Sequence, residues 1–302
     1  MVISPVKDAP AIVTSPPPTS RSVGSLPAPA LVLGAMVSIQ LGATIAKHLF
    51  EIAGAGTVAC VRIALAGAIA LLIWRPTFRV DRRALPAIAG LGISITAMNL
   101  SFYAAIERIP LGMAVTIEFL GPLAIALAGS RRWRDALCAV LAGIGVLLLV
   151  DSRGPVSWTG VLFALGAGVC WGSYIAFSAA VGRRTEGQGG LALAMAFGSI
   201  LVLPLVFSQP LAVVLDIRVL IGAAAIAVLS SLVPHGIEMA ALRRMKPSVF
   251  GVLMSLEPAV AAGVGLLLLG EGLGLNQWIG IGLVTLATAG AVRDTSPALT
   301  DA

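Results

Sequence analysis

The chain has 302 residues, of which 58% are hydrophobic and only 11% are charged. Soluble domains carry about 25% charged residues, so the composition excludes an ordinary soluble domain and indicates a membrane protein. The formal net charge is +6, but the basic residues lie in small clusters between apolar segments. This distribution indicates membrane-topology signals and argues against a nucleic-acid partner.

Residues 1–27 are rich in proline, serine, threonine and alanine. Such a segment cannot bury an apolar core, so we expect it to form a disordered N-terminal tail. No compact apolar stretch precedes a cleavage site in it, so we expect no signal peptide. The first apolar helix should then act as an uncleaved insertion signal.

Ten apolar segments follow, each about 18–25 residues long, which is the length a helix needs to cross roughly 30 Å of hydrocarbon. We place them at residues 29–49, 57–74, 84–106, 110–129, 133–150, 158–181, 190–208, 217–242, 247–269 and 275–292. Their connections are short, so neighbouring helices should run antiparallel. The predicted fold is an all-α polytopic membrane protein with ten transmembrane helices.

The connections between these segments alternate in charge. With ten helices, 15 of the 20 Lys and Arg residues fall on one side of the membrane, four fall on the other, and Arg62 lies within a helix. Cytoplasmic loops are enriched in Lys and Arg, so both termini should be cytoplasmic, including the short tail of residues 294–302. A missed helix would have broken this alternation.

A weak internal repeat relates the two halves of the chain. An offset of 136 residues places Tyr103–Arg108 on Met239–Arg244, and Pro122 on Pro258, without a gap. Each half has an odd number of helices, so the second half should enter the membrane inverted. Inverted repeats are typical of transporters, whose site lies near the midplane; chance similarity between Ala/Leu-rich helices is the alternative. The predicted halves are residues 28–151 and 158–293.

Two glutamates lie in the middle of long apolar segments. Glu118 is in the fourth predicted helix and Glu257 is in the ninth, so both should lie near the midplane. A carboxylate there is costly and indicates function by default. It could bind an ammonium group or carry a proton. The alternative is a structural role, with each glutamate protonated or paired with Arg62.

A proline accompanies each glutamate. Pro122 removes the hydrogen bond to the carbonyl of residue 118, and Pro258 does the same for residue 254. Each helix should therefore have a kink and a free carbonyl near the membrane centre, which suits an ammonium group. The glutamates do not coincide under the repeat, since Glu118 aligns with Met254, so we expect them to differ in role.

Two further charged residues of the predicted helices are candidate site residues. Arg62 could clamp a substrate carboxylate or act as a counter-ion for a glutamate; alternatively it snorkels outward or pairs with Glu51. Glu238 could line the pathway, or pair with Arg243 or Lys246 near the helix end.

His235 and Glu238 form an H-x-x-E spacing, which is not the H-E-x-x-H of a metalloprotease. His235 is either a proton-carrying group or a hydrogen-bonded helix histidine. The three cysteines are far apart and read as packing residues. We predict no metal site and no cofactor, and without a Walker motif a gradient is the expected energy source.

Several uncharged polar or aromatic residues could line a pathway, with interhelical hydrogen bonds as the alternative. They are Gln40, Asn99, Tyr103 and Trp171, together with Ser38, Thr116, Tyr174 and Ser231.

Five segments carry a family resemblance: Ser38–Gln40, Met98–Tyr103, Val115–Pro122, Gly166–Trp171 and Met254–Ala259. They resemble the bacterial threonine/homoserine exporters, within the EamA-type family of the drug/metabolite transporter superfamily. The resemblance covers about residues 30–292. It implies ten helices in two five-helix halves in the inner membrane, and export of small hydrophilic amino acids in exchange for protons.

The expected function is therefore secondary active export of threonine and homoserine by proton antiport. The alternative is an EamA-type exporter of another amino acid, metabolite or drug; the aromatic content of 5% favours a small polar substrate. An enzyme is not expected, because no nucleophile–base pair lies at membrane depth. The expected partners are the amino acid, protons and lipid, and a homodimer is left open.

Overall fold

A computed structural model describes residues 27–76, 81–128, 133–150, 157–185, 188–242, 244–245 and 247–294. All regular secondary structure in these ranges is helical. The predicted tails, residues 1–27 and 294–302, lie almost wholly outside the described residues.

The helices are α1 (Ala28–Trp74), α2 (Leu85–Ile106), α3 (Leu111–Glu118), α4 (Leu120–Leu127), α5 (Trp133–Val150), α6 (Trp158–Gly182), α7 (Gly189–Phe207), α8 (Leu211–Val214), α9 (Ile217–Ala227), the π-helical turn η1 (Val228–Leu232), α10 (Val233–Leu242), α11 (Pro247–Met254), α12 (Glu257–Leu269) and α13 (Leu275–Asp294).

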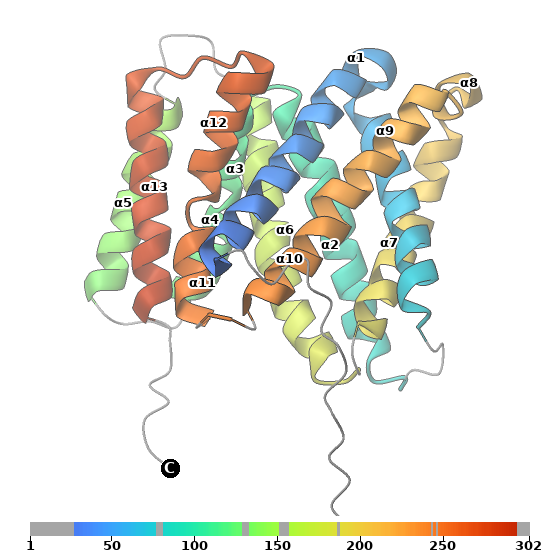
Figure 1. Ribbon diagram of the computed structural model, residues 1–302, viewed down its shortest axis with the longest axis horizontal. Coiled ribbons are helices and arrows are strands. Elements are labelled where there is room, and N and C mark those ends of the chain that lie inside the picture. The colour runs from blue at the N-terminus through green and yellow to red at the C-terminus, as the bar shows by residue number, and fades with distance from the viewer. Residues whose placement is uncertain are drawn as a thin grey trace, which may run out of the picture.

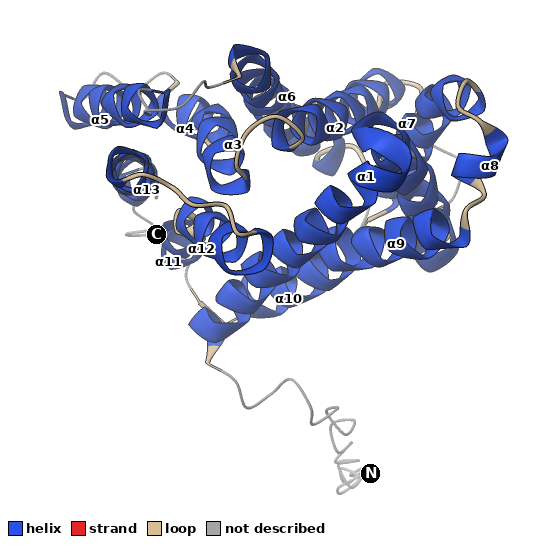
Figure 2. Cartoon of the chain, turned by 90° about the horizontal axis from the view of Figure 1, so that it is seen from above, coloured by secondary structure: helices blue, strands red, loops and turns tan. Residues whose placement is uncertain are grey.

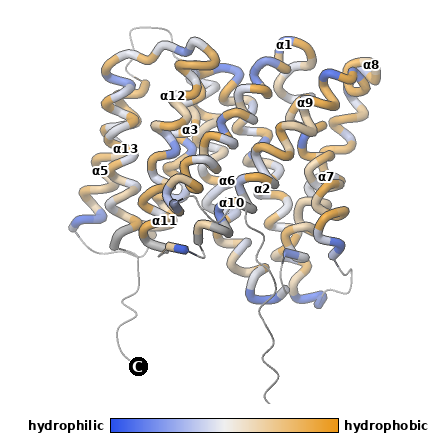
Figure 3. Tube along the Cα trace, in the orientation of Figure 1, coloured by the Kyte–Doolittle hydropathy of each residue, from blue (hydrophilic) through white to orange (hydrophobic). Residues whose placement is uncertain are grey.

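Within the described residues, seven helical segments are long and apolar enough to cross a membrane. They are α1, α2, α5, α6, α7, α13 and the stretch Val249–Leu269 that joins α11 and α12. Two shorter apolar stretches, Leu111–Leu127 and Ile217–Ser231, lie beside them. Apolar residues form a broad band across these helices, and many of the hydrophilic residues lie at their ends (Figure 3). The architecture is that of a multi-pass membrane protein.

The first two predicted helices are joined in α1, which turns back on itself at Gly54 (Figure 1). We expected them to end at residue 49 and begin at residue 57, but helical residues continue up to Gly54 from both sides. Gly54 has φ 74° and ψ 154°, a conformation that glycine adopts readily because it lacks a Cβ. The first arm of α1 therefore continues beyond residue 49, and the second arm begins before residue 57.

Two predicted helices are interrupted close to the prolines at which a kink was expected. Residues 110–129 form α3 and α4, which are separated at Phe119, and residues 247–269 form α11 and α12, which are separated at Ser255 and Leu256. Proline lacks an N–H and is tolerated in the first turn of a helix. Pro122 and Pro258 accordingly lie in the first turns of α4 and α12.

The predicted helix at residues 217–242 also departs from a regular α-helix. It consists of α9, the wider turn η1 and α10. Asp216 caps the start of α9 by accepting the backbone N–H of Arg218 at 2.8 Å. The Arg218 side chain also donates to this carboxylate, which holds the pKa of Asp216 below its usual range. η1 opens the middle of the helix, which is common at functional sites.

Viewed from above, the helices form two groups (Figure 2). In one group α5 packs on α13 and α3 packs on α12; in the other α1 packs on α7 and α9, and α2 packs on α7. The groups are linked by α6, which contacts α2, α3 and α4, and by α1, which contacts α12. The space between them is where the candidate site lies.

Helix α1 begins and α13 ends on the same side of the bundle (Figure 1), which we call the terminal face. The end of α1, the starts of α2 and α5, and the end of α6 also lie there. The arginines at these helix ends include Arg75, Arg82, Arg83, Arg134, Arg183 and Arg184. The other side, where α2 ends and α3 begins, is called the opposite face.

Glycines bring α4 directly against α6. A Cβ added at Gly121 would lie 2.6 Å from the carbonyl carbon of Gly168 and would collide with the oxygen of that carbonyl. We therefore expect Gly121→Ala to destabilise the protein by about 1–3 kcal/mol, the range for overpacked sites. Gly143→Ala is the matched control, because a Cβ there has no neighbour within 4 Å. The melting temperature of each variant is measured by thermal unfolding in detergent. Equal melting temperatures would contradict the close approach of α4 to α6.

Candidate functional site

A cavity of about 330 Å³ lies between the two groups of helices. Of the nine side chains predicted from the sequence as site residues, eight line this cavity. These eight are Gln40, Arg62, Asn99, Tyr103, Glu118, Trp171, Glu238 and Glu257. The ninth, His235, belongs to α10, but its side chain is outside the described part of the structure.

The two broken helices supply the two carboxylates. Glu118 is the last residue of α3 and Glu257 is the first residue of α12, and they are 8% and 6% exposed. A Cβ at Gly112 of α3 would lie 2.6 Å from Ala262 of α12, so these helices approach closely. The two carboxylates thus come from two closely packed helices, and both line the same cavity.

Gln40 of α1 reaches one of these carboxylates. Its Nε2 donates to Glu257 Oε1 at 3.3 Å, while its Oε1 has no hydrogen-bond partner among the described residues. Gln40 is 1% exposed. An unpaired acceptor in a buried site is costly, so this oxygen is available to a donor that enters the cavity.

The second arm of α1 places a cation on the other side. The Nη1 atom of Arg62 donates to Asn99 Oδ1, and the guanidinium carbon lies 5.5 Å from the centre of the Tyr103 ring. Asn99 is held in turn by its Nδ2, which donates to the Ile95 carbonyl at 2.8 Å. The sequence left open that Arg62 snorkels or pairs with Glu51, but it is 8% exposed and forms no ion pair with Glu51.

Aromatic side chains form much of the remaining wall. Trp171 packs edge-on against Phe119, with ring centres 4.9 Å apart and planes at 88°. Phe102, Tyr103 and Tyr174 also line the cavity. The cavity is therefore richer in aromatic residues than the chain as a whole. The low aromatic content of the chain does not support the preference for a small polar substrate.

One expected feature of the site differs in the structure. The carbonyl freed by Pro122, that of Glu118, was expected to face a ligand. Instead its oxygen lies against α6, where a Cβ on Gly168 would be 2.8 Å away. The close α3–α6 packing covers this acceptor, and the side chain of Glu118 is the group that reaches the cavity.

Glu238 lines the cavity from α10, four residues before that helix ends at the terminal face. Its expected partners, Arg243 and Lys246, lie outside the described residues. Nearby, η1 contributes Ser230, and Ser38 of α1 donates to the Leu229 carbonyl at 2.8 Å. Ser230 was not predicted, because a π-helical turn has no reliable sequence pattern.

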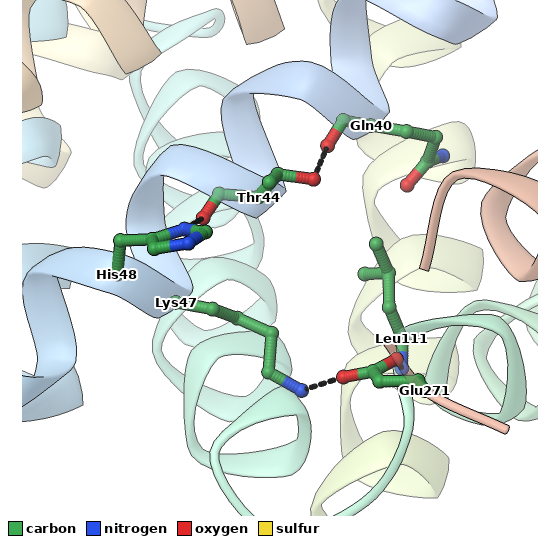
Figure 4. Close-up of polar contacts among 6 residues, drawn as sticks. All are labelled: Gln40, Thr44, Lys47, His48, Leu111 and Glu271. Atoms are coloured by element: carbon green, nitrogen blue, oxygen red, sulfur yellow. Dashed lines mark hydrogen bonds and ion pairs between the residues drawn. The ribbon is translucent and has the colours of Figure 1, made fainter. Parts of the chain in front are cut away.

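An ionic cluster that the sequence did not predict lies at the start of α3, on the side of the opposite face. Figure 4 shows its side chains. Lys47 of α1 pairs with Glu271 Oε1, and Glu271 Oε2 accepts the backbone N–H of Leu111 at 2.6 Å. The two charged side chains are 19% and 15% exposed. This cluster, which we call the latch, joins α1, the start of α3 and the loop that follows α12.

Each contact of the latch has a physical reason. Leu111 begins α3, where the backbone N–H groups lack helical partners and the helix dipole favours an anion. Glu271 follows Gly270, which has φ +66°, and the backbone N–H of Glu271 bonds the Gly265 carbonyl at 3.1 Å. Lys47 was counted only as a topology signal. Its position inside an apolar segment, on the side with few basic residues, was the available clue.

A cavity lined by side chains of both charge signs, between two groups of helices in a multi-pass membrane protein, is typical of a small-molecule transporter. Residues 158–293 match the EamA-like transporter family. The threonine/homoserine exporter RhtA of Escherichia coli (strain K12) is 38% identical over 267 residues, covering 86% of this chain and 90% of its own. RhtA of Salmonella typhimurium (strain LT2) matches with the same identity and coverage. The chain therefore belongs to the EamA-like transporter family and is a membrane exporter of the drug/metabolite transporter superfamily.

Two more distant proteins are also similar. The uncharacterized transporter YwfM of Bacillus subtilis (strain 168) is 27% identical over 156 residues, covering 52% of this chain and 53% of its own. A solved crystal structure with 18% identity covers 89% of this chain and 99% of its own, with a TM-score of 0.55. At that identity the likeness concerns the fold alone.

Proposed function

We propose that this protein exports small amino acids, with threonine and homoserine as the first candidates, in exchange for protons. The observation that carries the proposal is a single cavity lined by Glu118, Glu257 and Arg62. A zwitterion needs both charge signs within a few ångströms. The name of the relatives that are 38% identical points to the same substrates.

The size of the cavity agrees with a small substrate. Ligand sites typically measure about 300–1,000 Å³, and this one, at about 330 Å³, lies at the lower end. In the proposed arrangement the substrate ammonium contacts Glu257 and the free Oε1 of Gln40. Arg62 then attracts the opposite, carboxylate end of the substrate.

We assign different roles to the two glutamates. Glu257 lies in the first turn of α12, where the helix dipole favours an anion, and this supports binding of a cationic group. Glu118 ends α3 and lacks that stabilisation, and no described side chain donates a hydrogen bond to it. We propose that Glu118 carries the exchanged proton.

The proposed topology has ten passes in two inverted halves. Gly54 divides α1 into two arms, and the two shorter apolar stretches complete the count of ten. The repeat offset carries α3, Leu111–Glu118, onto α11, Pro247–Met254, and the break at Phe119 onto Ser255. We propose that the terminal face, which bears the arginine-rich helix ends, is cytoplasmic.

Transport would then alternate between two states of this bundle. The cavity includes Glu238 and Met254, which lie toward the terminal face, whereas the latch ties the helices on the opposite side. We propose that the structure is a state closed to the exterior, in which substrate enters from the cytoplasm.

The aromatic wall supports a second candidate within the same class. Trp171, Phe119 and Phe102 offer a surface to an apolar group, so a larger metabolite or a cationic drug is the alternative substrate. Such a substrate would not require a cation in the site, and Arg62 is the feature that favours the amino acid.

Efflux from loaded cells tests the proposal. A strain that overproduces the protein should export threonine and homoserine faster than a strain that lacks it, when both are loaded with dipeptides of these amino acids. Parallel loading with a cationic dye tests the alternative. Equal efflux of both amino acids from the two strains would contradict the substrate assignment, and faster dye efflux alone would favour the second candidate.

A further inference from the structure

A second, smaller cavity of about 40 Å³ lies beside the central one. The two share Arg62 and Asn99, and the smaller is completed by residues of α2, α7 and η1, among them Thr96, Met195 and Ser231. One buried water needs roughly 10–15 Å³. The smaller cavity therefore has room for about two or three non-hydrogen atoms.

Thr96 brings an unused hydroxyl to this cavity. The side chain is 6% exposed, and its Oγ1 has no hydrogen-bond partner among the described residues. Helical threonines usually bond the carbonyl four residues earlier, as Thr44 and Thr116 do, at 2.9 and 2.5 Å. Thr285 of α13 is the other buried exception, and it lines neither cavity.

The packing leaves space for this hydroxyl. A Cβ added at Gly198 of α7 would collide with Thr96 Oγ1. Glycine at this position therefore lets the hydroxyl lie close against α7, where a larger side chain would displace it.

Arg62 brings a second unused donor. Its Nη1 is bound to Asn99, but its Nε has no partner, and the residue makes no ion pair with a described carboxylate. A buried charge is costly unless it is paired. Two free donors, one of them cationic, therefore line a cavity whose volume suits a group of three atoms.

We propose that this smaller cavity is the subsite for the substrate's carboxylate, with Arg62 Nε–H and the Thr96 hydroxyl as donors to its oxygens. The inference rests on the proposed function and extends it by naming the substrate class. Substrates must carry a free carboxylate. The N–H groups of a primary amide would face the Arg62 and Thr96 donors, and an amide has no negative charge to pair with Arg62. Thr96 is thus a specificity-determining residue.

Thermal stabilisation of the purified protein by threonine and by threonine amide tests this subsite. The wild-type protein should require about tenfold less threonine than amide. Thr96→Val keeps the shape but removes the hydroxyl, and should raise the threonine requirement more than that of the amide, so that the preference becomes smaller while Arg62 retains part of it. Thr96→Ser, which restores a hydroxyl, should behave as the wild type, and Gly198→Ala should resemble Thr96→Val. A Thr96→Val protein with wild-type preference for threonine over its amide would overturn the proposal.

A failure of the proposed function gives a different result. If the wild-type protein neither binds nor exports threonine or homoserine, their assignment as substrates is wrong. The subsite is then judged with acetate, which should stabilise the wild-type protein more than Thr96→Val. Stabilisation by chloride and not by acetate would show a simple anion site and would overturn the carboxylate assignment.

Discussion

Replacing Glu118 with glutamine is expected to stop proton-driven threonine transport while the protein stays folded. Glutamine has the same shape but cannot exchange a proton in this pH range. The side chain is 8% exposed and lines the central cavity at the end of α3, so water cannot readily take over its role. In proteoliposomes with an imposed pH gradient, the transport rate should fall roughly 10- to 100-fold, the range for losing a charged interaction of about 1.5–3 kcal/mol.

The pH profile separates coupling from a general loss of activity. Residual threonine exchange by Glu118→Gln should no longer vary with pH, while that of the wild-type protein should. Glu107→Gln is the matched control, because Glu107 is an exposed carboxylate paired with Arg108 at the end of α2. Gradient-driven transport by Glu118→Gln at the wild-type rate would show that another group carries the proton.

The sequence was sufficient to predict an all-helical membrane protein and most of the polar groups that line the cavity, for a clear physical reason. A charge in an apolar run is costly, so Arg62, Glu118 and Glu257 stand out without any knowledge of the fold. The same argument brought in Gln40 and Asn99 as intramembrane polar residues. The structure places all five around one cavity.

The parts that the sequence did not predict depend on contacts between distant segments. Thr96 looks like any helical threonine until the glycine that faces it is known. Glu271 lies in a glycine-rich connection, and only the approach of α1 and α3 gives it two partners. The prolines predicted where α3–α4 and α11–α12 are interrupted, but the sequence alone did not give the length of each interruption.

Neutralising the latch is expected to open the opposite face. Glu271→Gln removes the ion pair with Lys47 but keeps an oxygen for the Leu111 N–H. Breaking a buried pair costs about 3–5 kcal/mol; these side chains are 19% and 15% exposed, so we expect about 2 kcal/mol. At 1.4 kcal/mol per tenfold change, the population open on that face should rise roughly 30-fold.

Labelling of a cysteine in the cavity measures this change. Ala43 lines the cavity one helical turn from Lys47 and is 5% exposed, so Ala43→Cys reports entry from the opposite face once the three native cysteines are replaced. An impermeant thiol reagent added to intact cells should label it about 30-fold faster in Glu271→Gln.

The doubly exchanged variant Lys47→Glu with Glu271→Lys should restore slow labelling in part, because it rebuilds the ion pair without the Leu111 bond. Arg218→Met, which breaks an exposed pair with Asp216, should change nothing. If Glu271→Gln is labelled no faster than this control, the latch does not hold the opposite face closed.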